Sequence, residues 1–149
     1  MKIITLIFLL IFPLLAYEVG DTLDKSISKK LSLNDKKITV ITFFASWCNS
    51  CEKEIPELNA FNTKLKSQNF ELIGVDIDKD IDNAKAFQKS LHVNFEVIND
   101  TKQEIVSAFK PLGMPSIYII KNSKVLHVMV GARDNVESEL SLYLKGLHE

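Results

Sequence analysis

The sequence predicts a single α/β domain built on one mixed sheet with helices on both faces. Apolar runs typical of strands alternate with amphipathic segments typical of helices, which predicts parallel strands joined by crossovers. Two further strands flank the short polar stretch 121–124, which predicts an antiparallel hairpin before a last helix. A length of 149 residues, 46% of them hydrophobic and 25% charged, suits one globular domain of this kind.

The first strand is expected at 38–44, where β-branched and aromatic residues form a continuous run typical of a buried strand. A helix should follow over 49–66, because its apolar positions recur three and four residues apart. Pro56 falls inside this helix and should bend it. The same criteria place the remaining strands at 70–77, 95–98, 116–120 and 125–130, and the remaining helices at 82–91, 102–109 and from about 134 to 147.

The N-terminus is expected to lie outside this domain. Residues 3–16 are almost entirely apolar and follow a single lysine, which is typical of a secretory signal and short for a membrane span. Residues 1–16 are therefore expected to be a signal peptide or an uncleaved N-terminal anchor. Residues 17–37 are interpreted as an irregular extension, with a short edge hairpin, before the domain at 38–149. Either reading of residues 1–16 implies export to a compartment where disulfides persist.

Charge and cysteine content exclude several classes of protein. The chain has 18 Lys and Arg against 19 Asp and Glu, so it lacks the basic surface of a nucleic-acid-binding protein. Two cysteines cannot form a multi-bridge scaffold, and alone they cannot complete a four-ligand zinc site. Alternating aspartates at 76–82 suggest a calcium loop, but Ile81 stands where that loop requires glycine. A strand end and a helix cap explain these aspartates better.

The two cysteines carry the clearest functional signal. Cys48 and Cys51 lie three residues apart, where the first strand meets the first long helix. A helix N-terminus stabilises a thiolate, and Cys51 follows within bridging reach, so the pair suits thiol–disulfide exchange. A structural disulfide would close a loop too short to stabilise much. A metal site would need further ligands. The three histidines are candidates, but none has helical spacing to either cysteine: His92, His127 and His148. We therefore expect redox chemistry with no metal or organic cofactor.

Three segments together resemble the thioredoxin superfamily and, within it, the exported TlpA/ResA-like thiol–disulfide oxidoreductases. They are Phe-Phe-Ala-Ser-Trp-Cys-Asn-Ser-Cys-Glu-Lys-Glu-Ile-Pro at 43–56, Gly-Met-Pro-Ser at 113–116 and Val-Gly-Ala at 130–132. The resemblance covers about 38–147 and implies a thioredoxin fold with the cysteine pair at the first strand–helix junction. The dipeptide Asn49-Ser50 is not the one found in thioredoxin or in strong oxidants, so it leaves the reduction potential unassigned.

The resemblance also implies a substrate groove beside the cysteine pair. In this superfamily the proline equivalent to Pro115 is cis and packs against the cysteines, and the backbone of Met114 is then free to bind an extended substrate. Gly131 resembles a glycine that lines the same groove, although a plain turn glycine is an alternative. Trp47 is either an apolar shield beside the disulfide or a core or rim aromatic residue.

Glu54 is the candidate proton acceptor. It lies one helical turn after Cys51, and the ResA-like pattern has a glutamate here that exchanges protons with the thiols. The buried acid of thioredoxin, six residues before the first cysteine, is Thr42 in this chain, which cannot accept a proton. The alternative is that Glu54 is an exposed helix carboxylate, like Glu52 and Glu57.

The resemblance implies an extracytoplasmic enzyme that reduces protein disulfides. Cys48 attacks and Cys51 resolves, the client is the Cys-x-x-Cys-His of apocytochrome c, and a membrane electron donor keeps the pair reduced. The expected contact with a membrane is only through residues 3–16, if they are uncleaved. The alternatives are a non-catalytic thioredoxin-fold peptide-binding module and a disulfide-forming oxidant. A peroxidase is less expected, because the sequence shows no second cysteine environment with the threonine and arginine that activate a peroxide-reducing thiol. The only arginine, Arg133, is remote in sequence from the cysteines.

Overall fold

A computed structural model describes residues 16–65 and 69–147 of the chain. The predicted signal or anchor segment therefore falls outside the described residues, apart from Ala16. Within the described ranges, no helix is both long enough and apolar enough to cross a membrane.

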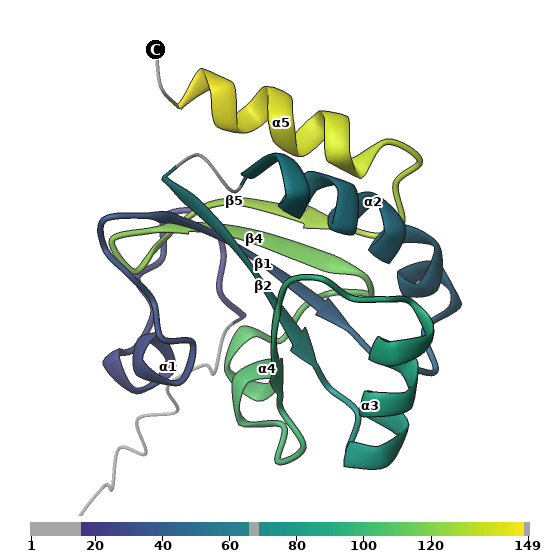
Figure 1. Cartoon of the computed structure of the whole chain (residues 1–149). Helices are drawn as coiled ribbons and strands as arrows, with labels where there is room; N and C mark the ends of the chain where they lie inside the picture. The colour runs from purple at the N-terminus through teal and green to yellow at the C-terminus, as the bar shows by residue number, and fades with distance from the viewer. Residues whose placement is uncertain (1–15, 66–68, 148–149) are drawn as a thin grey trace, which may run out of the picture.

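The core of the protein is a five-stranded mixed sheet in the order β3-β2-β1-β4-β5 (Figure 1). Strand β1 is parallel to β2, which is parallel to β3, whereas β4 runs antiparallel to both β1 and β5. The central strand β1 is buried along its whole length, as its apolar run predicts. The strands are β1 (Ile38–Phe44), β2 (Phe70–Asp76), β3 (Glu96–Asn99), β4 (Ser116–Lys121) and β5 (Lys124–Val130).

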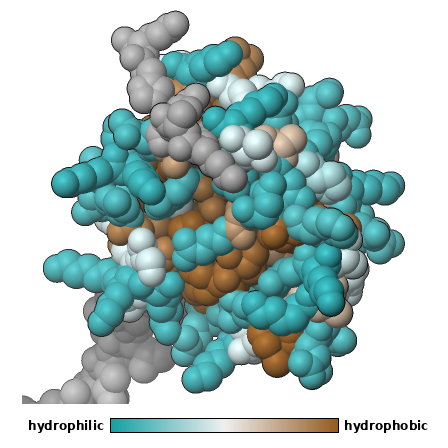
Figure 2. Space-filling view, in the orientation of Figure 1, coloured by the Kyte–Doolittle hydropathy of each residue, from teal (hydrophilic) through white to brown (hydrophobic). Residues whose placement is uncertain are grey.

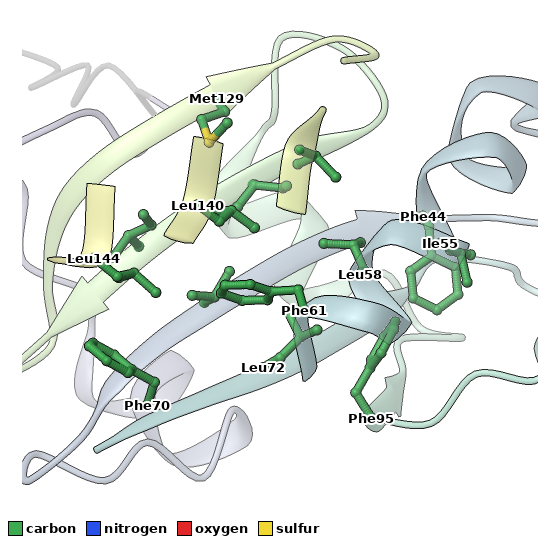
Figure 3. Packing of buried hydrophobic residues seen from close by; sticks show 14 of the residues in the cluster. Phe44, Ile55, Leu58, Phe61, Phe70, Leu72, Phe95, Met129, Leu140 and Leu144 are labelled. Atoms are coloured by element: carbon green, nitrogen blue, oxygen red, sulfur yellow. The ribbon is translucent and has the colours of Figure 1, made fainter. Parts of the chain in front are cut away.

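Helices cover both faces of this sheet, and each face has its own hydrophobic cluster. One face carries α2 (Asn49–Leu65), α3 (Ile81–Ser90) and α5 (Val136–Gly146), and its buried residues include both cysteines. Right-handed crossovers place α2 and α3 on the same face, since β1, β2 and β3 follow one another across the sheet. Phe61 of α2 packs between the sheet and α5 in this cluster, near Leu58, Leu72 and Leu140 (Figure 3). Pro56 lies inside α2 as predicted.

The opposite face carries α1 (Lys25–Lys30) and α4 (Glu104–Phe109). An ion pair between Lys30 and Glu104 links these two helices. In the view of Figure 2 the surface is mostly polar, with apolar side chains exposed near its centre. The predicted fold class is thus confirmed, and the predicted strands and long helices are displaced by only one or two residues at their ends.

The N-terminal extension differs from the prediction. It contains helix α1 instead of an edge hairpin, and the residues before α1 form an isolated bridge, Thr22 with Lys124, and backbone hydrogen bonds to Ser123 and Val125. Leu23, Ile27 and Leu31 are buried in the second cluster. These residues recur every four positions, which is a helical spacing, whereas the predicted hairpin rested on weak alternation at Leu31 and Leu33.

The turn between β4 and β5 is also tighter than predicted. Lys121 pairs directly with Lys124, so the loop contains two residues and not four. Both loop residues, Asn122 and Ser123, adopt left-handed backbone conformations with φ of 52° and 58°. Two positive φ angles in succession are characteristic of the type I′ turn, whose twist matches that of the strands it joins.

Candidate active site

The cysteine pair lies where β1 ends and α2 begins, as predicted. Cys48 and Cys51 form a disulfide with a Cα–Cα distance of 5.3 Å. The carbonyl oxygen of Cys48 accepts hydrogen bonds from the N–H groups of Cys51 and Glu52, at 3.0 and 3.2 Å. Cys48 therefore occupies the cap position of α2, where unpaired N–H groups and the positive end of the helix dipole meet.

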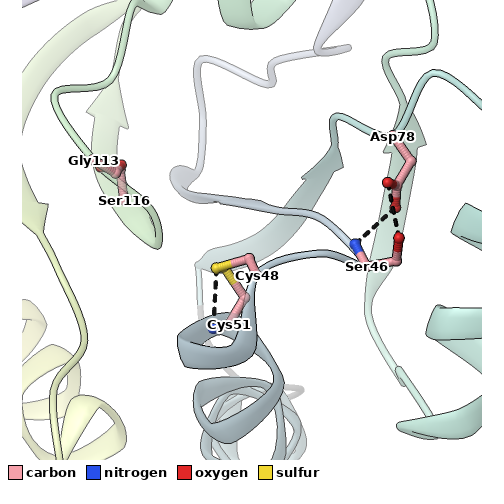
Figure 4. Close-up of a disulfide and its surroundings, with 6 residues drawn as sticks. All are labelled: Ser46, Cys48, Cys51, Asp78, Gly113 and Ser116. Atoms are coloured by element: carbon pink, nitrogen blue, oxygen red, sulfur yellow. Dashed lines mark hydrogen bonds between the residues drawn. A yellow bond between two sulfur atoms is a disulfide. The ribbon is translucent and has the colours of Figure 1, made fainter.

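The two sulfur atoms have different surroundings. The N–H of Cys51 donates a hydrogen bond to Sγ of Cys48 at 3.2 Å (Figure 4). Cys48 retains 7% of its accessible surface, whereas Cys51 retains 1%. Cys48 is thus the more exposed residue of the pair, and its Sγ accepts from a backbone donor that stabilises negative charge on sulfur.

Asp78 anchors the loop that carries Cys48. Its Oδ2 accepts a hydrogen bond from the N–H of Ser46 at 2.8 Å, and its Oδ1 accepts one from the Ser46 hydroxyl at 2.9 Å (Figure 4). The N–H of Asp78 in turn donates to Oδ1 of Asp76, at the end of β2, at 3.0 Å. The predicted helix cap is confirmed at Asp80, whose side chain accepts from the N–H groups of the first turn of α3.

Sequence reasoning did not assign this role to Asp78. The signal that could have indicated it is positional, because Asp78 and Cys48 both follow the carboxyl ends of neighbouring parallel strands. Such ends lie at the same edge of a sheet, where α/β proteins place their sites.

The structure brings three of the predicted groove residues together. The Met114–Pro115 peptide bond is cis, as predicted. Met114 packs against the cluster that contains both cysteines. The carbonyl oxygen of Pro115 accepts a hydrogen bond from the N–H of Gly131 at 2.9 Å, and Gly131 has a φ of +87° that favours glycine. In Figure 4 the Gly113–Ser116 loop lies opposite the disulfide.

Trp47, the fourth predicted groove residue, projects into solvent. Its side chain is 63% exposed, directly before Cys48. Trp47 is therefore not a core aromatic residue, whereas its alternatives as a rim residue and as a shield beside the disulfide both stay open.

Glu54 is a buried carboxyl group with an unusual environment. It is 4% exposed, and its Oε1 has no hydrogen-bond partner among the described residues. Burial raises the pKa of Glu54 from 4.5 to about 7; the charge of Glu57 adds to this shift, Arg133 opposes it, and Glu139 adds to it. The alternative reading as an exposed helix carboxylate is wrong. Near pH 7 this group is divided between its acid and carboxylate forms, so it can accept or donate a proton.

Arg133 is a second residue that sequence reasoning did not place at the site. It lies in the loop between β5 and α5, and its Nη1 donates to Oε2 of Glu139 at 2.8 Å. Its interaction with Glu54 lowers the pKa of that carboxyl group. Only the fold brings the residues together, since they are far apart in the chain. No cluster of three or more His, Cys, Asp or Glu side chains within the described ranges could hold a metal ion.

Comparison with known proteins identifies the chain's relatives. Residues 16–129 match the AhpC/TSA family. The thiol-disulfide oxidoreductase ResA of Bacillus thuringiensis subsp. konkukian is 32% identical over 120 residues, which span 78% of this chain and 68% of that protein. ResA of Bacillus subtilis is 30% identical over 112 residues, 73% of this chain and 63% of that protein.

Solved structures agree with this relationship. A Chlorobium tepidum protein described as a thiol:disulfide interchange protein DsbE superposes with a TM-score of 0.76 at 25% identity, covering 88% of this chain and 98% of that one. StoA from Bacillus subtilis shares the fold, with a TM-score of 0.67 at 20% identity over 74% of this chain and 84% of its own. With the disulfide of Cys48 and Cys51 at the strand–helix junction, the chain therefore belongs to the AhpC/TSA family of the thioredoxin superfamily and is a thiol-disulfide oxidoreductase of the ResA type.

Proposed function

We propose that the protein is an extracytoplasmic reductant of protein disulfides that acts in cytochrome c maturation. Its client in this proposal is the disulfide of the Cys-x-x-Cys-His segment of an apocytochrome c, and a membrane-bound dithiol donor restores its own dithiol. The observation that carries the proposal is Glu54, a buried carboxyl group one helical turn beyond Cys51 with a pKa of about 7. A proton acceptor so placed suits the step in which a mixed disulfide is released.

The reaction begins at Cys48. In the reduced protein its thiolate attacks one sulfur of the client disulfide, forming a mixed disulfide and releasing the other client sulfur as a thiolate. The cap position at α2 and the N–H of Cys51 stabilise the attacking thiolate. The 7% exposure of Cys48, against 1% for Cys51, favours Cys48 as the attacking residue.

Cys51 completes the exchange with Glu54 as its base. The Cys51 thiol gives its proton to the Glu54 carboxylate, and its sulfur attacks Sγ of Cys48 to form the internal disulfide. The mixed bond breaks, and the second client sulfur leaves as a thiolate that can take up the proton. Two electrons have then passed from the dithiol to the client. The state with the Cys48–Cys51 disulfide is the one the structure contains.

Exposed apolar side chains on the segments that carry the site residues support a protein client. Large hydrophobic side chains are exposed directly before Cys48, at Trp47, and on the segments that carry Pro115 and Gly131, at Leu112 and Val130. Exposed apolar residues of this size are typical of surfaces that bind other proteins. In the proposed role, the Met114 backbone binds the client chain in extended form between these side chains.

The proposed location and direction rest on the N-terminal segment and on the resemblance to ResA-like proteins. We propose that residues 1–16 export the domain, as a cleaved signal or an anchor. A domain in an oxidising compartment needs an electron supply to act as a reductant. We therefore expect at least half of the protein to be in the dithiol form in cells.

Trapping the mixed disulfide tests the proposal. A Cys51→Ser variant cannot complete the exchange, so it should accumulate in cells as a covalent adduct with an apocytochrome c. Non-reducing gels and mass spectrometry identify the adduct, and the Cys48→Ser/Cys51→Ser double variant should form none. The Cys48→Ser variant should also lose insulin-reduction activity.

The redox state in cells separates a reductant from an oxidant. Thiol alkylation followed by a gel shift reports the fraction of protein in the dithiol form. A pair that is fully oxidised at steady state, with trapped clients other than apocytochromes, would refute the proposed direction and client. The exchange chemistry at Cys48 and Cys51 would still stand in that case.

A further inference from the structure

We infer that Arg133 is a positioning residue for the exchange reaction and that its guanidinium group stabilises the carboxylate form of Glu54, the proposed proton acceptor. This inference rests on the proposed role of Glu54 as the proton acceptor of Cys51. It assigns a function to the single arginine of the chain, which lies outside the motifs that identify the family.

Hydrogen bonds connect both ends of the loop between β5 and α5, which carries Arg133, to other parts of the site. At its start, the N–H of Gly131 donates to the carbonyl oxygen of Pro115 at 2.9 Å, which fixes the loop beside the cis proline. At its end, the N–H of Glu137 donates to Oε2 of Glu57 at 3.3 Å, which fixes the beginning of α5 to α2. Glu57 lies one helical turn beyond Glu54. The loop is therefore held at both ends over the part of α2 that carries the buried carboxyl group.

Two buried atoms at this place lack partners. Within the described part of the chain, Oε1 of Glu54 and Nε of Arg133 are the buried side-chain atoms without a hydrogen bond. One is an acceptor and the other a donor, and an unpaired buried atom of either kind is costly. Nη1 of the same guanidinium group is engaged by Glu139 at 2.8 Å. Arg133 thus keeps one buried donor unbonded, and Glu54 keeps one buried acceptor unbonded.

The charges around Glu54 indicate that Arg133 stabilises the carboxylate form of Glu54. The charged groups that act on the pKa of Glu54 are Glu57 from α2, Glu139 from α5 and Arg133 from the loop. Burial and the two carboxylates disfavour the charged form of Glu54, and Arg133 alone among these groups favours it. Glu139 also pairs with Arg133, so it competes with Glu54 for the guanidinium group. Removing Arg133 should consequently raise the pKa of Glu54, and removing Glu139 should lower it.

A direct titration of Glu54 tests this inference without any catalytic assay. The carboxyl carbon of Glu54 is followed by NMR against pH in the oxidised protein labelled with carbon-13 glutamate. We expect Arg133→Gln to raise the pKa of Glu54 by roughly one unit, since one nearby positive charge is removed from a poorly solvated site. Arg133→Lys should keep most of the wild-type value, and Glu139→Gln should lower it.

A matched control uses the same pair of helices. Lys64→Gln removes a cation of α2 that pairs with Glu137 of α5 at 2.7 Å and does not act on Glu54. It should leave the Glu54 titration unchanged. A wild-type titration of Glu54 in the Arg133→Gln variant, or an equal shift in Lys64→Gln, would overturn the inference.

A kinetic experiment then separates this inference from the proposed function. The release of a preformed mixed disulfide at Cys48 is followed against pH by stopped flow. In Arg133→Gln the midpoint of the profile should move upward with the pKa of Glu54, and in a Glu54→Gln background the same substitution should change nothing. An equal effect in both backgrounds would mean that Arg133 acts elsewhere, while Glu54 keeps its role. A wild-type profile in Glu54→Gln alone would refute the role of Glu54, while the NMR titration still reports on Arg133.

Discussion

Asp78 and Glu54 are both buried acids next to the cysteine pair, with 5% and 4% of their surface exposed, yet their surroundings are opposite. Both oxygens of Asp78 accept hydrogen bonds from Ser46, two residues before Cys48. Glu54 has an oxygen with no partner among the described residues, and burial raises its pKa to about 7. A buried carboxylate whose oxygens are both hydrogen-bonded can fix a loop, whereas burial of a carboxyl group with an unbonded oxygen favours its neutral form and raises its pKa.

The substitution Glu54→Gln should have the largest effect. Removing the charge of Glu54 should increase the stability of the folded protein, which would sharpen the contrast with Asp78. The pKa of Glu54 is raised from 4.5 to about 7 in the folded protein, so folding disfavours its charged form. The free-energy cost of burying the charged Glu54 carboxylate is absent below the unfolded pKa. It grows as the pH rises from there through the folded pKa, and above the folded pKa it is roughly 3 kcal/mol. Glu54→Gln should therefore stabilise the oxidised protein by about this amount at pH 8.5 and hardly at all at pH 4.

Urea unfolding at the two pH values measures this difference. The control is Glu52→Gln, on the same helix but exposed to solvent, which should leave the pH dependence unchanged. If Glu54→Gln had the same effect at both pH values, the carboxyl group would not be penalised by burial, and the contrast with Asp78 would be lost.

Removing the Asp78 side chain should decrease the stability of the folded protein, by somewhat less than Glu54→Gln increases it. Asp78→Ala leaves the N–H and hydroxyl of Ser46 without their acceptors, which should cost about 2 kcal/mol of stability. Asp78→Asn keeps one acceptor oxygen and should cost less. Chemical unfolding at pH 7 measures both, and a stabilised Asp78→Ala variant would show that Asp78 is a strained group like Glu54 and not an anchor.

The smallest expected effect concerns the reactivity of the cysteines. In the reduced protein Cys48 should alkylate about tenfold faster than Cys51, because it lies at the open end of the helix. Asp78→Ala should lower this ratio, since the loop before Cys48 is no longer held in place. Peptide mass spectrometry after timed alkylation gives both rates, and equal rates in the wild-type protein would contradict the proposed roles of the two thiols.

Sequence patterns predicted most of the fold because most of its elements carry a local signal. The long helices have apolar residues at helical spacing, and β1 is a continuous apolar run. Helix α1 was missed because the prediction followed the weak alternation at Leu31 and Leu33, whereas the buried residues of this segment recur every four positions. The hairpin turn was predicted too long because it depends on two left-handed residues, Asn122 and Ser123, neither of which is glycine.

The sequence by itself determined the chemistry of this protein. Spacing within one helical turn brings Cys48 and Cys51 together, and the residues around them identify the family. Only the tertiary structure decided how the chemistry is controlled. Burial of Glu54 depends on the packing of α2 against α5 and the sheet, and its charged neighbours include Arg133 and Glu139, which lie far along the chain. Desolvation and electrostatic interactions act through space, so they depend on contacts that no local pattern in the sequence records.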